Sequence, residues 1–317
     1  MKAETTFTTV SSPRAIFTVL GADTYLGAHM VKHLRENDRM VCCVAQNEDF
    51  DCGIEPLCIN ELNKVSHDVQ AVETKWLVVC IDPGIGFEKY ISKIKKLCDN
   101  LAAKEFIGDI CFFSSAAICQ SGPEPISEET LVFPRTEQDL ALATGENLLA
   151  VLSCSPHGYA SPHIMRIGVP YGNETGMTET IGFVNEIIKA AERNCNFTIK
   201  KPSGALRTLT HISDICESAL RLMCLEFCPP LINIPGEMKT IADVAGLVAQ
   251  KFGVEFEEKG LSSHDEQDYY AGDQHLSAEY FNGTVKYDRK YIFEQWLHEK
   301  YFDKYSLNMQ TTNYNVI

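Results

Sequence analysis

The sequence predicts an α/β protein built on a doubly wound parallel sheet, with a smaller C-terminal lobe. Short runs of apolar and β-branched residues alternate with longer segments whose apolar residues recur at helical spacing. The short runs are almost continuously apolar, which is typical of parallel strands covered by helices on both faces. The intervening segments are long enough for the crossover helices that parallel strands require. A chain of 317 residues, of which 45% are hydrophobic and 22% charged, suits one large domain with a lobe, or two domains.

The elements are predicted in chain order. Strands are expected in AIFTVL, RMVCCVA, WLVVCI, DICFFSS and HIMRIG, which are residues 15–20, 39–45, 76–81, 109–115 and 163–168. Helices are expected at 25–36, 87–104, 136–153 and 180–194. The later sequence predicts a loop in KKPSGALR, a helix at 213–226, a strand at 231–234, a helix at 240–252 and a polar tail, SLNMQTTNYNVI. We expect residues 1–165 to form the sheet domain, to which 205–235 return, and residues 166–317 to form mainly the lobe and the tail.

Composition and charge exclude several classes of protein. A formal net charge of -15 and a pI near 5.0 oppose nucleic-acid binding, because such a surface needs clustered Lys and Arg. The chain has no run of roughly 18 apolar residues, and its start, MKAETTFTTVSSPR, lacks the pattern of a signal peptide. We therefore expect a cytoplasmic protein that does not bind membranes. The 13 cysteines form no CxxC pair or zinc-like spacing, which predicts core thiols and no metal site.

The seven residues GADTYLG follow the first predicted strand and lead into the first predicted helix. This placement puts backbone N–H groups and the positive end of a helix dipole where dinucleotide-binding proteins hold a pyrophosphate. Gly21 suits the tight turn and Gly27 suits close packing of helix on strand, but Thr24 stands where a second glycine is expected. A turn with a purely structural role explains the same residues, so both interpretations stay open.

The end of the second predicted strand does not select a cofactor. An acidic residue about 20 positions after the loop binds the ribose 2′-hydroxyl of NAD, and a basic residue suits the 2′-phosphate of NADP. Here Ala45, Gln46 and Asn47 are neutral. The expected cofactor is therefore NAD or NADP, without a choice between them.

Five segments, taken in order, resemble the extended short-chain dehydrogenase/reductases, also called NAD-dependent epimerase/dehydratases. GADTYLG resembles the family's GxxGxxG loop, and FFSSAAICQSGPEPISEET resembles its serine-bearing strand end and the segment after it. RIGVPYG resembles R-x-x-N-x-Y-G, RTLTHISDI resembles R-x-x-x-H-V-x-D, and LINIPGEMKTIADVAGLVAQKFG resembles a later strand and helix. The resemblance implies a Rossmann sheet within residues 1–165 that binds NAD or NADP, and a lobe that binds a nucleotide sugar.

The resemblance also implies which residues contact the ligands. Ser114 and Ser115 lie where the family keeps the hydroxyl that polarises the reacting carbonyl, although a strand end that satisfies its own backbone is the alternative. Arg207 corresponds to an arginine that contacts the substrate's diphosphate, and Tyr171 to a position near the substrate. Asp82 takes a place beside the cofactor where alanine is expected, and would repel a pyrophosphate unless it points away. The residues implied at the cofactor are Gly21, Asp23, Thr24, Tyr25, Leu26, Gly27, Gln46 and Asp82.

The family's catalytic tyrosine and lysine are absent. Aligning PRTEQDLALATGENLL with the family's P-x-S-P-Y-G-x-S-K-x-x-x-E places Gln138 at the tyrosine and Leu142 at the lysine. A primary amide has no proton to exchange near neutral pH, and leucine supplies neither positive charge nor a donor for ribose hydroxyls. No lysine occurs between Lys104 and Lys189, so a shifted alignment does not restore the pair. Loss of positioned acid–base catalysis costs about 10²- to 10⁴-fold in rate.

Three hypotheses about function follow. The chain is a catalytically degenerate homologue, a pseudoenzyme that binds a nucleotide or small ligand; or an active epimerase, dehydratase or reductase with Glu137 or Tyr171 as a substitute acid–base group; or a structural homologue with an empty cleft. We predict the first and keep the second as its alternative. Glu137 and Asp139 are otherwise explained as first-turn carboxylates at a helix N-terminus. Many relatives pair through the helix that corresponds to 136–153, so a homodimer is expected, although burial within the monomer explains its apolar side equally well.

Overall fold

The computed structural model describes residues 16–45, 74–154, 160–173, 175, 181–200, 203–259, 273–285 and 287–302. Its centre is a six-stranded sheet in the order β2-β1-β3-β4-β5-β9, in which every pair of neighbours is parallel. The strands are β1 (Ile16–Leu20), β2 (Met40–Val44), β3 (Thr74–Val79), β4 (Gly108–Ser115), β5 (Ala160–Ile167) and β9 (Leu231–Asn233). The predicted doubly wound parallel sheet is confirmed.

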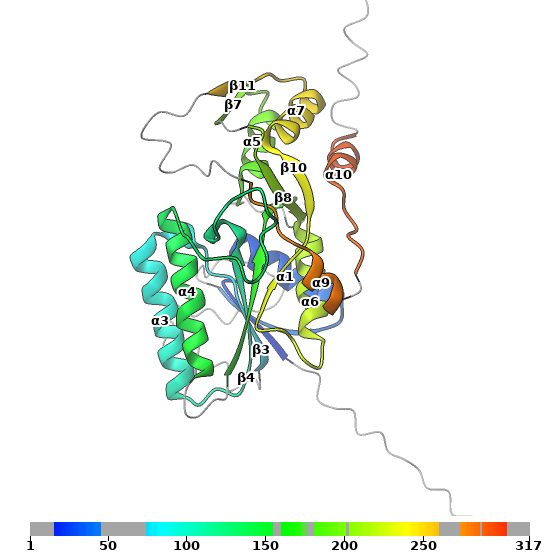
Figure 1. Ribbon diagram of the computed structural model, residues 1–317. Helices are drawn as coiled ribbons and strands as arrows, with labels where there is room; N and C mark the ends of the chain where they lie inside the picture. Colours follow the sequence, from blue (N-terminus) through cyan, green and yellow to red (C-terminus); the bar gives the residue numbers. More distant parts are fainter. Residues whose placement is uncertain are drawn as a thin grey trace, which may run out of the picture.

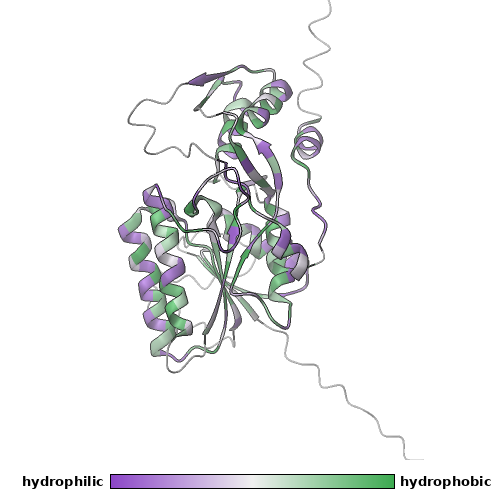
Figure 2. Ribbon diagram, in the orientation of Figure 1, coloured by the Kyte–Doolittle hydropathy of each residue, from purple (hydrophilic) through white to green (hydrophobic). Residues whose placement is uncertain are grey.

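Helices cover both faces of this sheet (Figure 1). One face carries α3 (Phe87–Ala103) and α4 (Glu137–Ser153), and the other carries α1 (Tyr25–Glu36) and α6 (Ile212–Met223). Along β4 the buried side chains alternate, because Ile110 and Phe112 join the core beneath α3 and α4, whereas Cys111 and Phe113 join the core beneath α1 and α6. Figure 2 shows the apolar residues concentrated in the strands between the two layers of helices.

The strand order has a topological switch point at β1. From β1 the chain passes to β2 on one side, and it then crosses to β3 on the other side of β1. Ligands of open α/β sheets bind at such a switch point, beyond the carboxyl ends of the strands. The loop from Gly21 to Thr24 and the segment that follows β3 both lie at this place.

The lobe has its own core. Strands β6 (Val169–Tyr171), β8 (Leu206–His211) and β10 (Glu237–Thr240) form one small sheet, and β7 (Phe197–Lys200) pairs with β11 (Phe256–Lys259) in another. Helices α5 (Phe183–Glu192), α7 (Ile241–Phe252) and α10 (Phe293–Lys300) pack around them. Two short helical turns, η1 (Pro83–Ile85) and η2 (Ala116–Ile118), follow β3 and β4, and α9 (Glu279–Thr284) packs near β9.

The lobe differs most from the sequence prediction. The predicted loop KKPSGALR contains the end of β7 at Lys200 and the start of β8 at Leu206, so the loop prediction is wrong at both ends. The chain then returns to the main sheet through α6 and β9, while β8 stays in the lobe sheet. The predicted polar tail lies outside the described residues. None of the described helices is both long and apolar enough to cross a membrane.

Candidate functional site at the switch point of the sheet

The loop between β1 and α1 depends on its two glycines. Gly21 has φ of +82°, a conformation that side chains disfavour, and a Cβ on it would overlap the carbonyl oxygen of Cys80. A Cβ on Gly27 would overlap the carbonyl oxygen of Gly21. The first glycine therefore allows the loop to lie against the end of β3, and the last allows α1 to lie against the loop.

Thr24, at the place of the missing glycine, turns its hydroxyl inward. Its Oγ1 lies 2.8 Å from the carbonyl oxygens of both Gly21 and Cys80, and it accepts a hydrogen bond of 3.1 Å from the N–H of Gly27. Thr24 thus caps α1 and ties the loop to the segment after β3. Within the part of the chain that the structure describes, no acceptor meets the N–H of Leu26 in the first turn of α1. An open backbone donor at a helix N-terminus suits a phosphate oxygen.

The other residues implied at the cofactor are arranged around this loop. The hydroxyl of the buried Tyr25 donates to the carbonyl of Gly172 at 2.6 Å and links α1 to the end of β6. Asp82 accepts a hydrogen bond of 2.8 Å from the N–H of Gly84, so one of its oxygens is turned onto its own turn. Asp23 is half-buried in the loop, and Gln46 lies outside the described residues.

The two serines at the end of β4 differ in their hydrogen bonds: Ser115 bonds to the local backbone, and the hydroxyl of Ser114 does not. Ser115 accepts a hydrogen bond of 3.1 Å from the N–H of Ala117 and caps η2, as a strand end that satisfies its own backbone does. The hydroxyl of Ser114 is buried and meets no hydrogen-bond partner among the described residues. Ser114 is thus the serine whose hydroxyl is left for a further partner.

Beside Ser114, a buried ion pair connects the sheet to α4. Arg166 lies next to Ser114 in the register of β4 and β5, and its guanidinium makes two hydrogen bonds of 3.1 and 2.8 Å to the carboxylate of Glu146. Both side chains are buried. Such a bidentate pair fixes α4 relative to the sheet. The sequence placed both residues in motifs but gave no indication that they are paired.

The start of α4 satisfies its own polar groups. Thr136 and Asp139 form a capping box, in which each side chain accepts a hydrogen bond from the other residue's backbone. Glu137 accepts a hydrogen bond of 2.7 Å from the N–H of Phe87 and so caps the neighbouring α3. Gln138 is exposed, and Leu142 is 8% exposed within the apolar core beneath α3 and α4. These contacts give the first-turn carboxylates a structural role.

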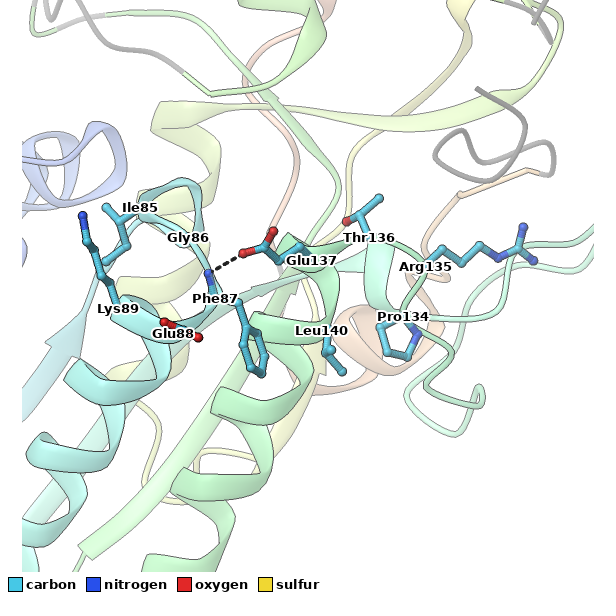
Figure 3. Close-up of a pocket in the computed structure, with 10 residues that line it drawn as sticks. All are labelled: Ile85, Gly86, Phe87, Glu88, Lys89, Pro134, Arg135, Thr136, Glu137 and Leu140. Atoms are coloured by element: carbon cyan, nitrogen blue, oxygen red, sulfur yellow. Dashed lines mark hydrogen bonds between the residues drawn. The ribbon is translucent and has the colours of Figure 1, made fainter. Parts of the chain in front are cut away.

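A pocket of about 690 Å³ opens between the first turns of α3 and α4. Figure 3 shows Lys89 and Arg135 on opposite sides of it, and the hydrogen bond between Glu137 and Phe87 crosses the space between the two helices. Of the site residues predicted from the sequence, only Glu137 lines this pocket. The pocket therefore lies beside the start of α4 and does not include the glycine loop.

The two residues implied at the substrate lie in the lobe. Tyr171 is 1% exposed, and its ring packs edge-on against Phe293 and Trp296 at centroid distances of 5.1 and 5.0 Å. Burial raises the pKa of Tyr171 well above its ordinary value, and nearby Glu237 raises it further. Arg207 is buried in β8, and one of its guanidinium nitrogens donates to the carbonyl of Leu206 at 2.7 Å.

The predicted site residues fall into three groups in the structure. The glycine loop, Asp82 and the serine pair lie at the carboxyl ends of β1, β3 and β4, which are neighbours in the sheet. Gln138 and Leu142 lie on α4, which packs against β4. Tyr171 and Arg207 lie on β6 and β8 of the lobe sheet.

Comparison with solved structures identifies proteins of the same fold. UDP-glucose 4-epimerase from Thermus thermophilus, solved with NAD, has a TM-score of 0.76 and 16% identity, and the match covers 92% of this chain and 99% of that one. dTDP-glucose 4,6-dehydratase from Bacillus anthracis, also with NAD, has a TM-score of 0.75 and 14% identity over 92% and 98% of the two chains. MoeE5 with UDP-glucuronic acid and NAD has a TM-score of 0.73 and 17% identity over 89% and 96%. No family model and no curated protein matches the sequence.

Proposed function

We propose that this protein binds NAD at the switch point of the sheet and a nucleotide sugar or similar small ligand beside the lobe, as a binding or regulatory protein without the family's acid–base chemistry. One observation carries the proposal: the glycine loop keeps a backbone geometry suited to a pyrophosphate, while Gln138 and Leu142 stand where the proton-transferring pair is expected.

The residues at the loop fit a dinucleotide. The N–H of Leu26 and the positive end of α1 would meet the pyrophosphate, and the inward turn of the Thr24 hydroxyl directs that polar group away from the ligand. One carboxylate oxygen of Asp82 accepts a hydrogen bond from the N–H of Gly84, which holds that oxygen against its own turn. A bound nicotinamide ring would be able to accept or donate a hydride. NAD is favoured over NADP because the structural neighbours were solved with NAD.

The residues that would have to replace the lost acid–base pair are engaged or shielded. Glu137 accepts a hydrogen bond from the N–H of Phe87 and caps α3, so its carboxyl group already has a structural partner. Tyr171 is buried among aromatic rings, and burial disfavours its phenolate. Gln138 is exposed but has no proton to transfer. These positions support binding without turnover.

The ligand expected beside NAD is inferred from the neighbours. MoeE5 was solved with UDP-glucuronic acid and with UDP-glucose, and its fold spans nearly the whole of this chain. A homodimer through α3 and α4 is part of the proposal, because Leu140 and Val151 expose apolar side chains on α4.

Isothermal titration of the purified protein with NAD, NADH, NADP and NADPH tests the binding step. We expect micromolar binding of NAD and NADH, and weaker binding of the phosphorylated pair. UDP-glucose and UDP-glucuronic acid are then titrated with and without NAD. Failure of all four dinucleotides to bind would overturn the proposal.

A paired substitution tests the loss of catalysis. Wild type should show neither reduction of NAD nor conversion of a nucleotide sugar, whereas Gln138→Tyr with Leu142→Lys should restore a slow reaction. Gln138→Phe with Leu142→Lys is the matched control, since it lacks only the phenolic hydroxyl. Turnover by wild type that is abolished by Glu137→Gln or Tyr171→Phe would instead support an active enzyme with a substitute acid–base residue.

A further inference from the structure

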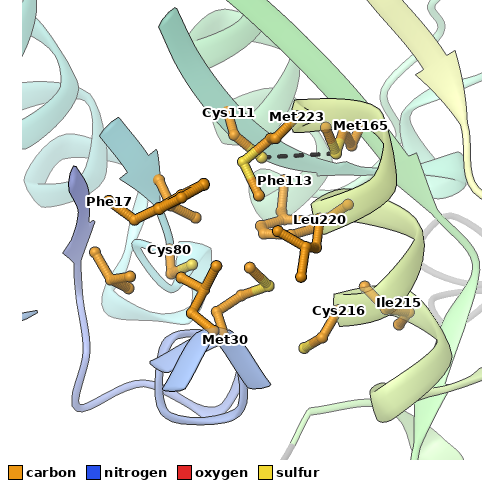
Figure 4. Close-up of a cluster of buried hydrophobic side chains, with 14 of the residues drawn as sticks. Phe17, Met30, Cys80, Cys111, Phe113, Met165, Ile215, Cys216, Leu220 and Met223 are labelled. Atoms are coloured by element: carbon orange, nitrogen blue, oxygen red, sulfur yellow. Dashed lines mark hydrogen bonds between the residues drawn. The ribbon is translucent and has the colours of Figure 1, made fainter. Parts of the chain in front are cut away.

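An exposed apolar segment, Leu131 to Phe133, lies on the surface shortly before the start of α4. The side chains of Leu131, Val132 and Phe133 are 72%, 43% and 57% exposed. By comparison, Phe113 in β4 is 5% exposed and packs in the core beneath α1 and α6, as Figure 4 shows. Three consecutive apolar side chains in water are unfavourable, and such a run is typical of a surface that binds another protein.

The backbone of this segment presents an open strand edge. The C=O of Leu131 accepts a hydrogen bond of 2.9 Å from the N–H of Gln120. The N–H of Phe133 donates to the C=O of Ile118 at 2.7 Å. Because a trans peptide unit points its N–H and C=O in opposite directions, the N–H and C=O of Val132 face away from this antiparallel neighbour. Among the described residues, neither group meets a hydrogen-bond partner. Such an edge can pair with a strand of another chain.

The backbone selects one antiparallel register for pairing with a second copy of the segment. Pro134 has no N–H, and the N–H of Thr130 already donates within its own turn at 3.2 Å. Val132 therefore has to supply the hydrogen bonds. When Val132 lies opposite Val132 of the second copy, the two residues exchange both of their hydrogen bonds, and Leu131 lies opposite Phe133 of the second copy. Apolar cross-strand pairs of this kind stabilise neighbouring strands.

The charges that flank the segment are also complementary to a second copy. Glu129 lies in the turn before it and Arg135 lies two residues after it, and both side chains are exposed. The guanidinium of Arg135 lies 5.5 Å from the centre of the Phe133 ring, so this charge stays at the end of the apolar segment. In the antiparallel register, the turn that holds Glu129 lies beside Arg135 of the second copy, at both ends of the pairing. Salt screens the general repulsion between two chains of net charge -15 beyond about 8 Å at physiological ionic strength.

We propose that two copies of this protein associate through residues 129–135, which form an antiparallel pair of strands across a twofold axis. The contact is isologous, because the same surface of each copy takes part. It needs no ligand, and it uses a different surface from the face of α4 that carries Val151, so it does not depend on the proposed function. Pro134 and Arg135 also line the pocket beside α4, which would therefore open next to the interface.

The test exchanges the two charges. Glu129→Arg and Arg135→Glu each replace two attractive contacts of the dimer with repulsive ones, and each should weaken self-association about tenfold. A mixture of the two variants restores both opposite-charge contacts in the heterodimer, so it should associate about as tightly as wild type. Glu192→Arg and Arg193→Glu are the controls, because they make the same changes of net charge at exposed positions at the end of α5. Sedimentation equilibrium over a concentration series measures each dissociation constant.

A second measurement uses the unmodified protein. Exchange of the Val132 amide proton should slow as the protein concentration rises, because only the paired form protects it. The Phe133 amide is the internal reference, since its N–H is already bonded to Ile118 within each copy, and its exchange should change little. Exchange at Val132 that does not depend on concentration would contradict the inference.

The outcomes separate this contact from pairing through α3 and α4. Val151→Asp should leave a dimer, because Val151 lies near the far end of α4. If wild type stays monomeric at every concentration, or if Val151→Asp abolishes an association that both charge variants keep, the inference is wrong. A mixture of the charge variants that associates no more tightly than each variant alone would also overturn it. None of these results bears on the dinucleotide titrations that test the proposed function.

Discussion

The glycine loop and the start of α4 differ in how far their polar groups are satisfied within the protein. In the loop, steric contacts require Gly21 and Gly27, and among the described residues no acceptor meets the N–H of Leu26 in the first turn of α1. At the start of α4, Glu137 and the capping box satisfy the helix ends, and Leu142 has joined the core. The comparison teaches that a turn can leave a backbone donor open at one helix N-terminus, while the side chains at another helix N-terminus satisfy its donors.

The largest expected effect is the loss of stability when the ion pair between α4 and the sheet is broken. Arg166→Met leaves the carboxylate of Glu146 buried without its partner, which should lower the free energy of unfolding by about 3–5 kcal/mol. Arg166→Met with Glu146→Leu removes both charges and should recover much of the loss. Urea unfolding of the single and double variants measures the difference. Equal losses in both would show that the pair does not hold α4 in place.

The second prediction tests the steric requirement at the loop. Gly27→Ala places a methyl group onto the carbonyl oxygen of Gly21 and should cost roughly 3 kcal/mol of stability. It should also weaken NAD binding, because α1 must shift away from the loop. Gly246→Ala is the control, since Gly246 lies within α7 with nothing near its Cβ position, and it should stabilise the protein by about 0.5–1 kcal/mol. Unfolding and NAD titration of both variants provide the readout; similar stability of the two would contradict the steric explanation.

The same two regions show what sequence can and cannot predict. The parallel strands were predictable because both of their faces are buried, so that runs such as WLVVCI are apolar without interruption. The lobe strands were not, because β7 (FTIK) and β8 (LRTLTH) mix polar with apolar residues and form no continuous apolar run. Motif spacing placed Gln138 and Leu142 on the helix that the structure shows, since a helix preserves its register along the sequence.

Contacts between distant segments account for what the sequence did not indicate about the site. Tyr171 packs against Phe293 and Trp296, which lie more than a hundred residues later in the chain. The sequence around Tyr171 does not predict a contact over that separation. The role of Glu137 depends on the N–H of Phe87, a backbone donor that has no sequence signature.

The smallest expected effect concerns the charge of Asp139 at the start of α4. Burial raises the pKa of this carboxyl above its ordinary value of 3.8, although hydrogen bonds from Thr136 act in the opposite direction. Because the folded protein holds the proton more tightly than the unfolded chain, the contribution of Asp139 to stability is fully present below pH 3.8 and is lost as the pH rises through the folded pKa. Relative to Asp139→Asn, wild type should therefore lose stability on going from about pH 3 to about pH 7.

The control for this effect is the capping box at the start of α7. Thr240 and Asp243 form the same arrangement at the start of α7, but Asp243 is exposed and its carboxylate stays in water. Asp243→Asn removes the corresponding carboxyl group from an exposed capping box, and its unfolding free energy is measured over the same pH range for reference. If the difference between wild type and Asp139→Asn grows in favour of wild type with rising pH, the carboxylate at the start of α4 is stabilised by the fold. The start of α4 would then hold a site that favours negative charge, and its comparison with the glycine loop would have to be revised.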